Sequence, residues 1–175
     1  GRAVGASLGL ADGAWLGLAL GPAVTSYARG AAFVVQKYLE RPLLVERLKF
    51  DIRQFVLVRS LAPLEVFVYD DFYVRFASVP YAPPTTRAML GDRATHLTNM
   101  QVQKDVDGFN KTVAENQWSG AQLRAHLDAR FGAGTWDTRV RPRMLRLIVE
   151  AMAAWDRSNH RANSYEIFGV DVMLD

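Results

Sequence analysis

The sequence contains no cysteine, which excludes a disulfide framework, a cysteine-ligated zinc site, an iron–sulfur cluster and thiol catalysis. Histidine is scarce: His96, His126 and His160 are the only three, and no two of them are spaced as a helical pair of metal ligands. A metal site built on histidine is therefore not indicated. Any metal that binds needs oxygen ligands.

Several catalytic motifs are absent as well. No glycine-rich Walker A loop lies near Lys37 or Lys49, and no G-x-S-x-G motif or Ser/His pair indicates a hydrolase triad. A large excess of positive or negative charge is also absent, because 21 Lys and Arg residues against 18 Asp and Glu residues leave a net charge of only +3. This balance permits nucleic acid binding without indicating it. No basic motif with stacking aromatics is present, so we expect no nucleic acid partner.

Residues 1–32 are rich in Gly, Ala and Leu and carry only Arg2, Asp12 and Arg29 as charges. Asp12 interrupts the apolar stretch, which falls short of the roughly 20 continuous apolar residues of a membrane span, so we expect no membrane partner. We interpret this segment as atypical or disordered, and residues 33–175 as part of one folded domain. Because the chain opens without methionine and stops within an apolar, strand-like run, we expect a fragment cut at both ends.

Runs of β-branched and aromatic residues predict strands in the folded part, with turns at prolines between them. The expected strands are residues 33–39, 49–59, 65–69, 72–77 and 164–174. Three of them follow one another closely, which favours antiparallel hairpins. The stretch 80–92, with three prolines close together, is predicted to be a loop.

Two helices are predicted in the second half of the chain. The first begins after its N-cap Ser119 and ends at Gly132, and its inward face is expected to contain Leu123, Leu127 and Phe131. The second has Pro142 in its first turn and runs to about Arg157, with an inward face of Leu145, Ile148, Val149, Met152 and Trp155. Strands and helices in separate runs indicate an α+β fold.

Charged residues alternate with apolar ones along the strand 49–59. Lys49, Asp51 and Arg53 fall on one face at period 2, while Phe50 and Ile52 fall on the other. Two interpretations stay open. The charges form a solvated sheet face with mutual ion pairs, or they form a site for the phosphates and Mg²⁺ of a nucleotide.

Other polar residues stand in apolar surroundings and need partners. Arg75 lies mid-strand, where a guanidinium requires a carboxylate or a phosphate, and Asp51 or Glu65 would serve. Asp171 lies in an apolar strand, where Mg²⁺ would be a partner. The segment 96–99 is expected to join the loop to a strand. The hydroxyl and amide of its Thr98-Asn99 pair either contact a sugar or phosphate or cap a local turn.

Five motifs occur in order and together resemble the tubulin–tyrosine ligase-like family over about residues 33–175. They are Val35-Gln36-Lys37-Tyr38-Leu39, Lys49-Phe50-Asp51-Ile52-Arg53, Tyr73-Val74-Arg75-Phe76, His96-Leu97-Thr98-Asn99 and Ser164-Tyr165-Glu166-Ile167-Phe168-Gly169-Val170-Asp171. The resemblance implies an ATP-grasp fold and an ATP- and Mg²⁺-dependent ligase. Such an enzyme activates a glutamate side chain of an acidic tubulin tail as an acyl phosphate, which the amine of a free amino acid then attacks.

The resemblance also implies residue roles by motif matching. The adenine hinge would be Gln36, Lys37, Tyr38 and Leu39. Lys49 would contact phosphate, Asp51 would lie by the nucleotide and its metal, and Asp171 would ligate Mg²⁺. The catalytic cations would be Lys49, Arg53 and Arg75, with the two arginines neutralising the acceptor or the tetrahedral intermediate. Thr98 and Asn99 would line the nucleotide and amino-acid pocket.

The segments 51–58 and 115–119 resemble the glycylase branch more than the glutamylase branch, so glycine is the favoured substrate. The alternatives are a polyglutamylase and an inactive nucleotide- or microtubule-binding pseudoenzyme. The family's Glu-x-Asn strand and its phosphate loop are not in this chain, so we expect the fragment alone to be inactive. The resemblance implies a cytoplasmic, cytoskeletal protein, with the cilium, axoneme or basal body as a narrower expectation.

Four arginines lie near the start of the second predicted helix: Arg139, Arg141, Arg143 and Arg146. Two interpretations stay open for them. They steer acidic tubulin tails toward the site, or they form a solvated basic start of the helix.

Overall fold

The computed structural model describes residues 38–86, 89, 91–106, 116–154 and 163–175, together with the backbone of four short strands before residue 33. The described strands form a seven-stranded antiparallel sheet in the order β2-β1-β9-β6-β7-β8, with β5 also paired to β6. Their bounds are β1 Ala6–Gly9, β2 Trp15–Leu18, β5 Leu44–Val45, β6 Leu48–Leu61, β7 Leu64–Pro80, β8 Gln117–Ser119 and β9 Glu166–Val172. A separate pair joins β3 Tyr27–Ala28 to β4 Ala31–Ala32.

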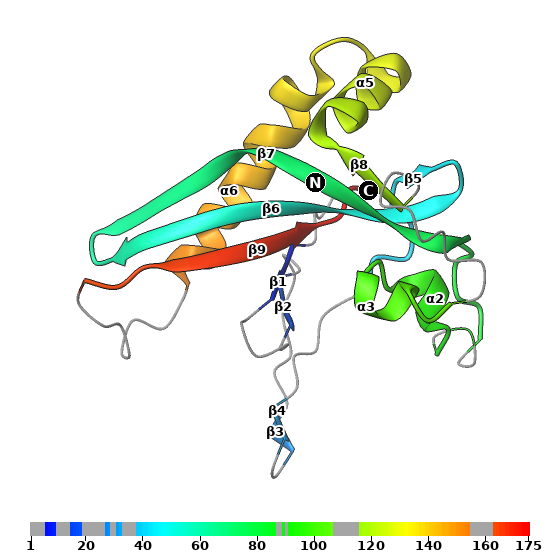
Figure 1. Ribbon diagram of the computed structural model, residues 1–175, viewed down its shortest axis with the longest axis horizontal. Helices are drawn as coiled ribbons and strands as arrows, with labels where there is room; N and C mark the ends of the chain where they lie inside the picture. The colour runs from blue at the N-terminus through cyan, green and yellow to red at the C-terminus, as the bar shows by residue number, and fades with distance from the viewer. Residues whose placement is uncertain are drawn as a thin grey trace.

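The long β6–β7 hairpin dominates the sheet, and β9 lies along β6 (Figure 1). The separate strands predicted at 65–69 and 72–77 are wrong, because β7 runs unbroken from Leu64 to Pro80. The register of β6 against β7 shifts between Gln54 and Val56, and this shift accommodates extra residues in β7. The buried Gln54 side-chain amide donates to the Tyr69 carbonyl oxygen at 2.6 Å. The sequence suggests a break between two strands at the acidic pair Asp70-Asp71, but a bulge accommodates this pair within one continuous strand.

The remaining strand predictions are confirmed with shifted ends, with one exception. The strand predicted at 49–59 is β6, Leu48–Leu61, and the last strand, predicted at 164–174, is β9, Glu166–Val172. The predicted strand 33–39 is wrong at its end, because Tyr38 and Leu39 have no regular structure, and its first five residues lie outside the described residues.

The described helices are α2 Arg93–His96, α3 Met100–Gln103, α5 Gly120–Phe131, the π-helix η1 Trp136–Val140 and α6 Arg141–Ala153. In Figure 1, α6 crosses behind the β6–β7–β9 part of the sheet, and α2 and α3 lie near the far end of β7. The α+β prediction is confirmed.

The start and end of α5 agree with the prediction. Ser119 and Gln122 form a capping box, and Gly132 ends the helix at φ 101°, where glycine has no steric penalty. Leu123 and Leu127 are buried as expected, but Phe131 is 44% exposed because it lies in the last turn, beyond the sheet contact.

The inward face of α6 is not the predicted one. Ile148 and Met152 are buried, whereas Leu145 is half-buried and Val149 is 48% exposed. Trp155 lies outside the described residues. The buried face consists of Met144, Leu147, Ile148, Ala151 and Met152. Two adjacent faces of the helix are apolar, so the periodicity of apolar residues does not determine which face packs on the sheet.

The core lies between the sheet and the helices α5, η1 and α6. Phe50, Ile52 and Val74 point into it, with exposed fractions of 1% or less. Trp136 of η1 stacks on Phe72 of β7 with ring centroids 4.2 Å apart. This confirms that Phe50 and Ile52 face away from the charged residues of β6. The opposite face of β6 is thereby left for polar side chains.

Replacing Ser119 by alanine should lower the free energy of unfolding by about 1 kcal/mol, because the Gln122 amide of α5 loses its acceptor. Urea denaturation followed by circular dichroism measures this change. Ser119→Asp keeps an acceptor and should stay within about 0.5 kcal/mol of the parent. Equal losses in both variants would contradict a capping role.

Candidate functional site

Lys49, Asp51 and Arg53 of β6 lie on the sheet face opposite α5 and α6, as the alternation predicts. The interpretation of a solvated face is wrong, because Lys49 is 3% and Asp51 5% exposed. The charges do pair, but across strands rather than along β6. Antiparallel register places Asp51 opposite Arg75 of β7, and Arg53 opposite Asp171 of β9.

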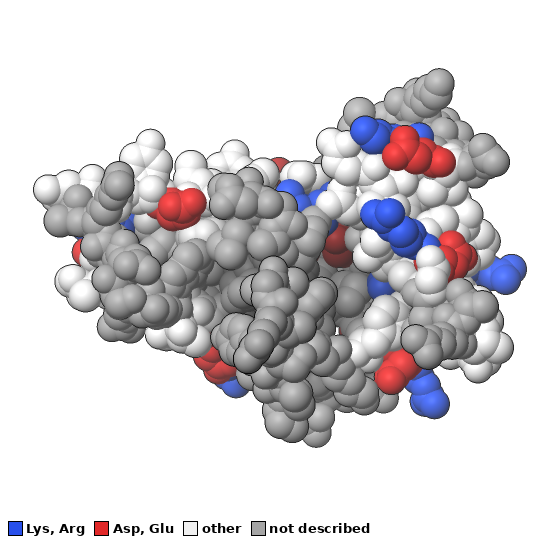
Figure 2. All heavy atoms as spheres, turned by 90° about the horizontal axis from the view of Figure 1, so that it is seen from below, with Lys and Arg blue, Asp and Glu red and all other residues white. Residues whose placement is uncertain are grey.

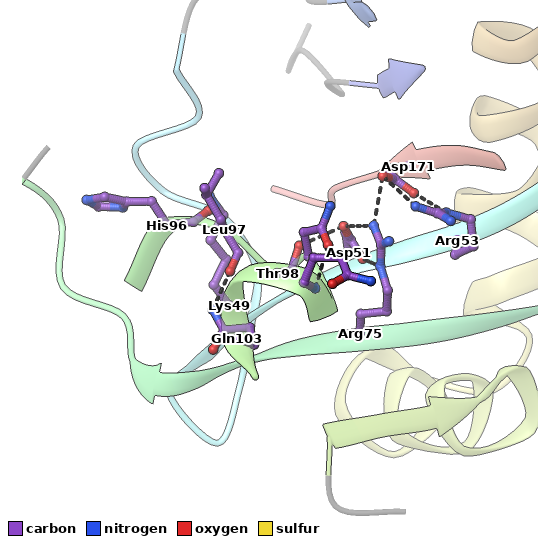
Figure 3. A network of polar contacts seen from close by, with 11 residues as sticks. Lys49, Asp51, Arg53, Arg75, His96, Leu97, Thr98, Gln103 and Asp171 are labelled. Atoms are coloured by element: carbon purple, nitrogen blue, oxygen red, sulfur yellow. Dashed lines mark hydrogen bonds and ion pairs between the residues drawn. The ribbon is translucent and has the colours of Figure 1, made fainter. Parts of the chain in front are cut away.

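These four residues form one alternating ion network (Figure 3). The Arg75 guanidinium contacts both carboxylates: its Nε donates to Asp51 Oδ1 at 2.8 Å, and its Nη2 lies 2.7 Å from Asp171 Oδ2. Arg53 binds both oxygens of Asp171: its Nε donates to Oδ1, and its Nη2 donates at 3.1 Å to Oδ2, the oxygen that Arg75 also contacts. Asp51 therefore partners Arg75, as predicted, whereas Glu65 binds Arg59 at the exposed hairpin end.

Burial controls the electrostatics of this network. Burial raises the pKa of Asp51 above its ordinary value, while the Arg75 guanidinium and the Thr98 hydroxyl oppose the rise. Burial acts to lower the pKa of Arg75, but its bonds to Asp51 and its attraction to Asp171 outweigh that effect, and the pKa is raised. The two arginines and two aspartates balance one another in charge.

Lys49 stands beside the network and is held differently. Its Nζ donates to the His96 carbonyl oxygen at 2.8 Å and to the Tyr38 hydroxyl at 3.3 Å. It also lies over the Tyr38 ring, 4.8 Å from the centroid, and 5.9 Å from that of Tyr81. Burial lowers the pKa of Lys49 to about 8. Within the described part of the chain, no carboxylate forms an ion pair with this ammonium group.

The Tyr38 hydroxyl and His96 form a directed chain of hydrogen bonds. His96 Nε2 lies 2.7 Å from the Met89 carbonyl oxygen, which only accepts, so Nε2 carries a proton. In the neutral ring, Nδ1 then accepts from the Tyr38 hydroxyl at 2.7 Å. Burial raises the pKa of Tyr38, which keeps the phenol protonated for this role.

The segment 96–99 connects α2 to α3, so the prediction that it joins the loop to a strand is wrong. Thr98 is buried and donates to Asp51 Oδ2 at 2.7 Å. The Asn99 side chain instead accepts from the Gln101 amide at 2.8 Å and caps α3. The turn-cap interpretation therefore describes Asn99, whereas a contact of Thr98 with a sugar or phosphate stays a prediction.

Seven predicted site residues converge on one face: Tyr38, Lys49, Asp51, Arg53, Arg75, Thr98 and Asp171. Leu39 lies next to Tyr38 and is half-buried. Asn99 points toward α3 rather than into the network. Gln36 and Lys37 lie outside the described residues.

The sequence patterns assigned no role to His96 or Gln103. His96 lies within one of the family motifs, and its two-residue spacing from Thr98 was the available signal. Gln103 gave none, because a glutamine in a short helix reads as a solvent-facing residue. In the structure it is fully buried, at 0% exposed.

The four predicted arginines of the 139–146 segment are all exposed. Arg141 lies 3.8 Å from the exposed Asp70, a contact worth little in water. On the face seen in Figure 2, Lys and Arg side chains alternate with Asp and Glu, and no large patch of one sign covers its described surface. The solvated interpretation describes these arginines, and steering of an acidic tail remains a prediction.

Comparison with known proteins identifies relatives of this chain. The model of the tubulin-tyrosine ligase family matches residues 21–175. The chain belongs to the tubulin-tyrosine ligase family. This member of the family is 38% identical over 151 residues to the tubulin monoglycylase TTLL3 of Danio rerio, and the match covers 83% of this chain and 19% of that protein.

Other relatives carry either of two activities in their names. Tubulin glycylase 3A of Drosophila melanogaster is 35% identical over 159 residues, 89% of this chain and 16% of its own length. Tubulin polyglutamylase ttll-4 of Caenorhabditis briggsae is 35% identical over 157 residues, 83% of this chain and 25% of its own length. The chain thus spans a quarter or less of each of these tubulin-tyrosine ligase relatives.

The donor set of this family member can be tested against Mg²⁺. Asp51 and Asp171 flank a single guanidinium, and carboxylate oxygens are the ligands that Mg²⁺ takes, one or two at a time, beside phosphates and water. The described residues contain no cluster of three or more acidic or imidazole side chains able to hold a metal. The two carboxylates are of the kind that Mg²⁺ takes, and in this structure their oxygens accept from Arg53, Arg75 and Thr98. None of the described helices is long and apolar enough to cross a membrane.

Proposed function

We propose that this chain contributes the nucleotide and acceptor site of an ATP-dependent ligase of the ATP-grasp type, which joins glycine to glutamate side chains of tubulin tails. The acceptor carboxylate attacks the γ-phosphorus of ATP and releases ADP. The amine of glycine then attacks the acyl phosphate carbon, loses a proton and displaces inorganic phosphate. The isopeptide bond that forms leaves a branch on the tail.

One observation carries the proposal, namely the buried ammonium of Lys49. A buried cation without a carboxylate partner in the described chain is costly, and an anionic ligand relieves that cost. Phosphate oxygens of a nucleotide supply such an anion. The aromatic rings of Tyr38 and Tyr81, which lie close to the Lys49 ammonium group, form the apolar side of this proposed phosphate site.

The ion network divides the remaining roles by exposure. The Arg53 side chain is 19% exposed, whereas those of Arg75 and Asp171 are 5% and 3% exposed. Arg53 is therefore the cation that an acceptor carboxylate can reach, and Arg75 holds the two aspartates in place. Asp171, with Asp51 beside it, would hold Mg²⁺, which would offset the charge of the phosphates.

Glycine is preferred to glutamate because glycylases supply the names of several relatives, including a protein monoglycylase TTLL8 of Mus musculus that is 34% identical over 147 residues. The partners that follow are tubulin with its acidic tails, microtubules and a free amino acid. The expected place of action is the cytoskeleton, including the cilium with its axoneme and basal body.

The protein that contains this chain should transfer labelled glycine to tubulin in the presence of ATP and Mg²⁺. Asp171→Asn keeps the shape of the side chain but removes its charge, and it should abolish labelling to background. Asp70→Asn is the matched control, because Asp70 is exposed, and it should retain labelling within about twofold. Scintillation counting of tubulin after gel separation measures the transfer.

Three results would change this proposal. Labelling by glutamate in place of glycine would assign the polyglutamylase activity. ATP binding without any labelling would indicate a pseudoenzyme. Equal labelling by Asp171→Asn and the parent protein would remove Asp171 from the site.

A further inference from the structure

The turn that presents His96 and Thr98 has little stability of its own. Its flanking helices α2 and α3 contain four residues each, far below the length at which a helix is stable alone. Yet this turn supplies two contacts of the site, the His96 carbonyl oxygen on Lys49 and the Thr98 hydroxyl on Asp51. Something outside the turn has to hold it against the sheet.

The Gln103 side chain contacts both this segment and the sheet. Its Nε2 donates to the Ala94 carbonyl oxygen at 2.9 Å and also to the Leu97 carbonyl oxygen. Its Oε1 accepts from the Ser78 amide of β7 at 2.8 Å. One amide thus ties α2 and Leu97, the first residue after it, to the strand that also carries Arg75.

The chemistry of these contacts requires an amide. Two carbonyl oxygens need two donors and one backbone N–H needs an acceptor, and a primary amide carries both in one rigid plane. A carboxylate at this position would face two carbonyl oxygens with no proton to give. An apolar side chain would leave all three backbone groups without this partner in a site that is 0% exposed.

We propose that Gln103 is a positioning residue for the nucleotide site, acting through His96 and Thr98 without touching the ligand itself. The Leu97 carbonyl oxygen accepts from the Gln103 side chain, and the Asn99 side chain caps α3. Both neighbours of Thr98 are therefore fixed by hydrogen bonds. Figure 3 shows Gln103 beneath the segment that runs from His96 to Thr98. The inference rests on the nucleotide site proposed above.

A second buried glutamine makes a matched control possible. Gln54 is 1% exposed and donates to the Tyr69 carbonyl oxygen, but it faces the core side of β6, away from the turn. Gln103→Met and Gln54→Met each remove a buried amide of the same size. Both should lower the urea midpoint of unfolding, so a loss of stability does not distinguish them.

Binding of ATP with Mg²⁺, measured by isothermal calorimetry well below the unfolding midpoints, separates the two variants. Gln103→Met should weaken binding about tenfold or more, and Gln54→Met should stay within about twofold of the parent protein. Gln103→Glu should bind at least as weakly as Gln103→Met, although it has the shape of glutamine. Equal affinities of Gln103→Met and the parent would overturn the proposal, as would equal weakening in the two methionine variants.

Amide hydrogen exchange tests the same proposal without any nucleotide. Exchange in residues 94–100 should speed up about tenfold in Gln103→Met and remain unchanged in Gln54→Met, while α5 and α6 exchange alike in both. Unchanged exchange in 94–100 overturns the positioning role. If the parent protein binds no ATP, the proposed function fails, and this exchange measurement alone then decides whether Gln103 holds the turn.

Discussion

Replacing Arg75 by leucine should lower the free energy of unfolding by about 3–5 kcal/mol, because it leaves two buried carboxylates without the guanidinium between them. Asp51 would keep the Thr98 hydroxyl, and Asp171 would keep Arg53. Burial already raises the pKa of Asp51 with Arg75 present, so removal of the cation pushes it toward the protonated form. Urea denaturation at pH 7, followed by tryptophan fluorescence, measures the loss.

Two further variants make this result specific. Arg59 forms an exposed pair with Glu65, and Arg59→Leu should leave the urea midpoint of unfolding nearly unchanged, because water screens such a pair. Adding Asp51→Asn to Arg75→Leu removes one of the two buried negative charges left without Arg75, and it should recover part of the lost stability. A double variant no more stable than Arg75→Leu would show that packing, rather than charge, sets the cost.

Replacing Lys49 by methionine should remove most nucleotide binding while leaving the fold nearly as stable at pH 7. A charged hydrogen bond to phosphate contributes about 1.5–3 kcal/mol, so affinity for ATP should fall roughly ten- to hundredfold. The fold should lose no more than about 1 kcal/mol, because a buried cation is exchanged for an apolar side chain of similar length. Calorimetric titration and urea denaturation give the two quantities.

The pH dependence of stability gives an independent check on Lys49. Its pKa is lowered from 10.5 to about 8 in the folded protein, so between these values the unfolded chain binds more protons than the folded one. Stability therefore gains from this group as pH rises from about 8 to 10.5, by up to about 3 kcal/mol, and gains nothing below that window. The gain should be missing in Lys49→Met. It should persist in Lys104→Met, whose lysine is exposed.

The local rules of the sequence determined much of this protein. Ser119 and Gly132 mark the two ends of α5 in the sequence because helix capping involves residues only a few positions apart. Alternation along β6 separated Lys49 and Asp51 from Phe50 for the same reason, since the strand period is a local property. The ordered motifs also led to the family that the comparison confirmed.

Only the tertiary structure decided which charges meet and how deeply they are buried. Arg53 and Asp171 are 118 positions apart, and they pair because β6 and β9 align in one particular register. Sequence pattern gives the face of a strand but not its register with a distant partner, which depends on the packing of the whole sheet. The same holds for Gln103, whose role arises where α3 approaches β7, and for α6, where packing on the sheet chose between two apolar faces.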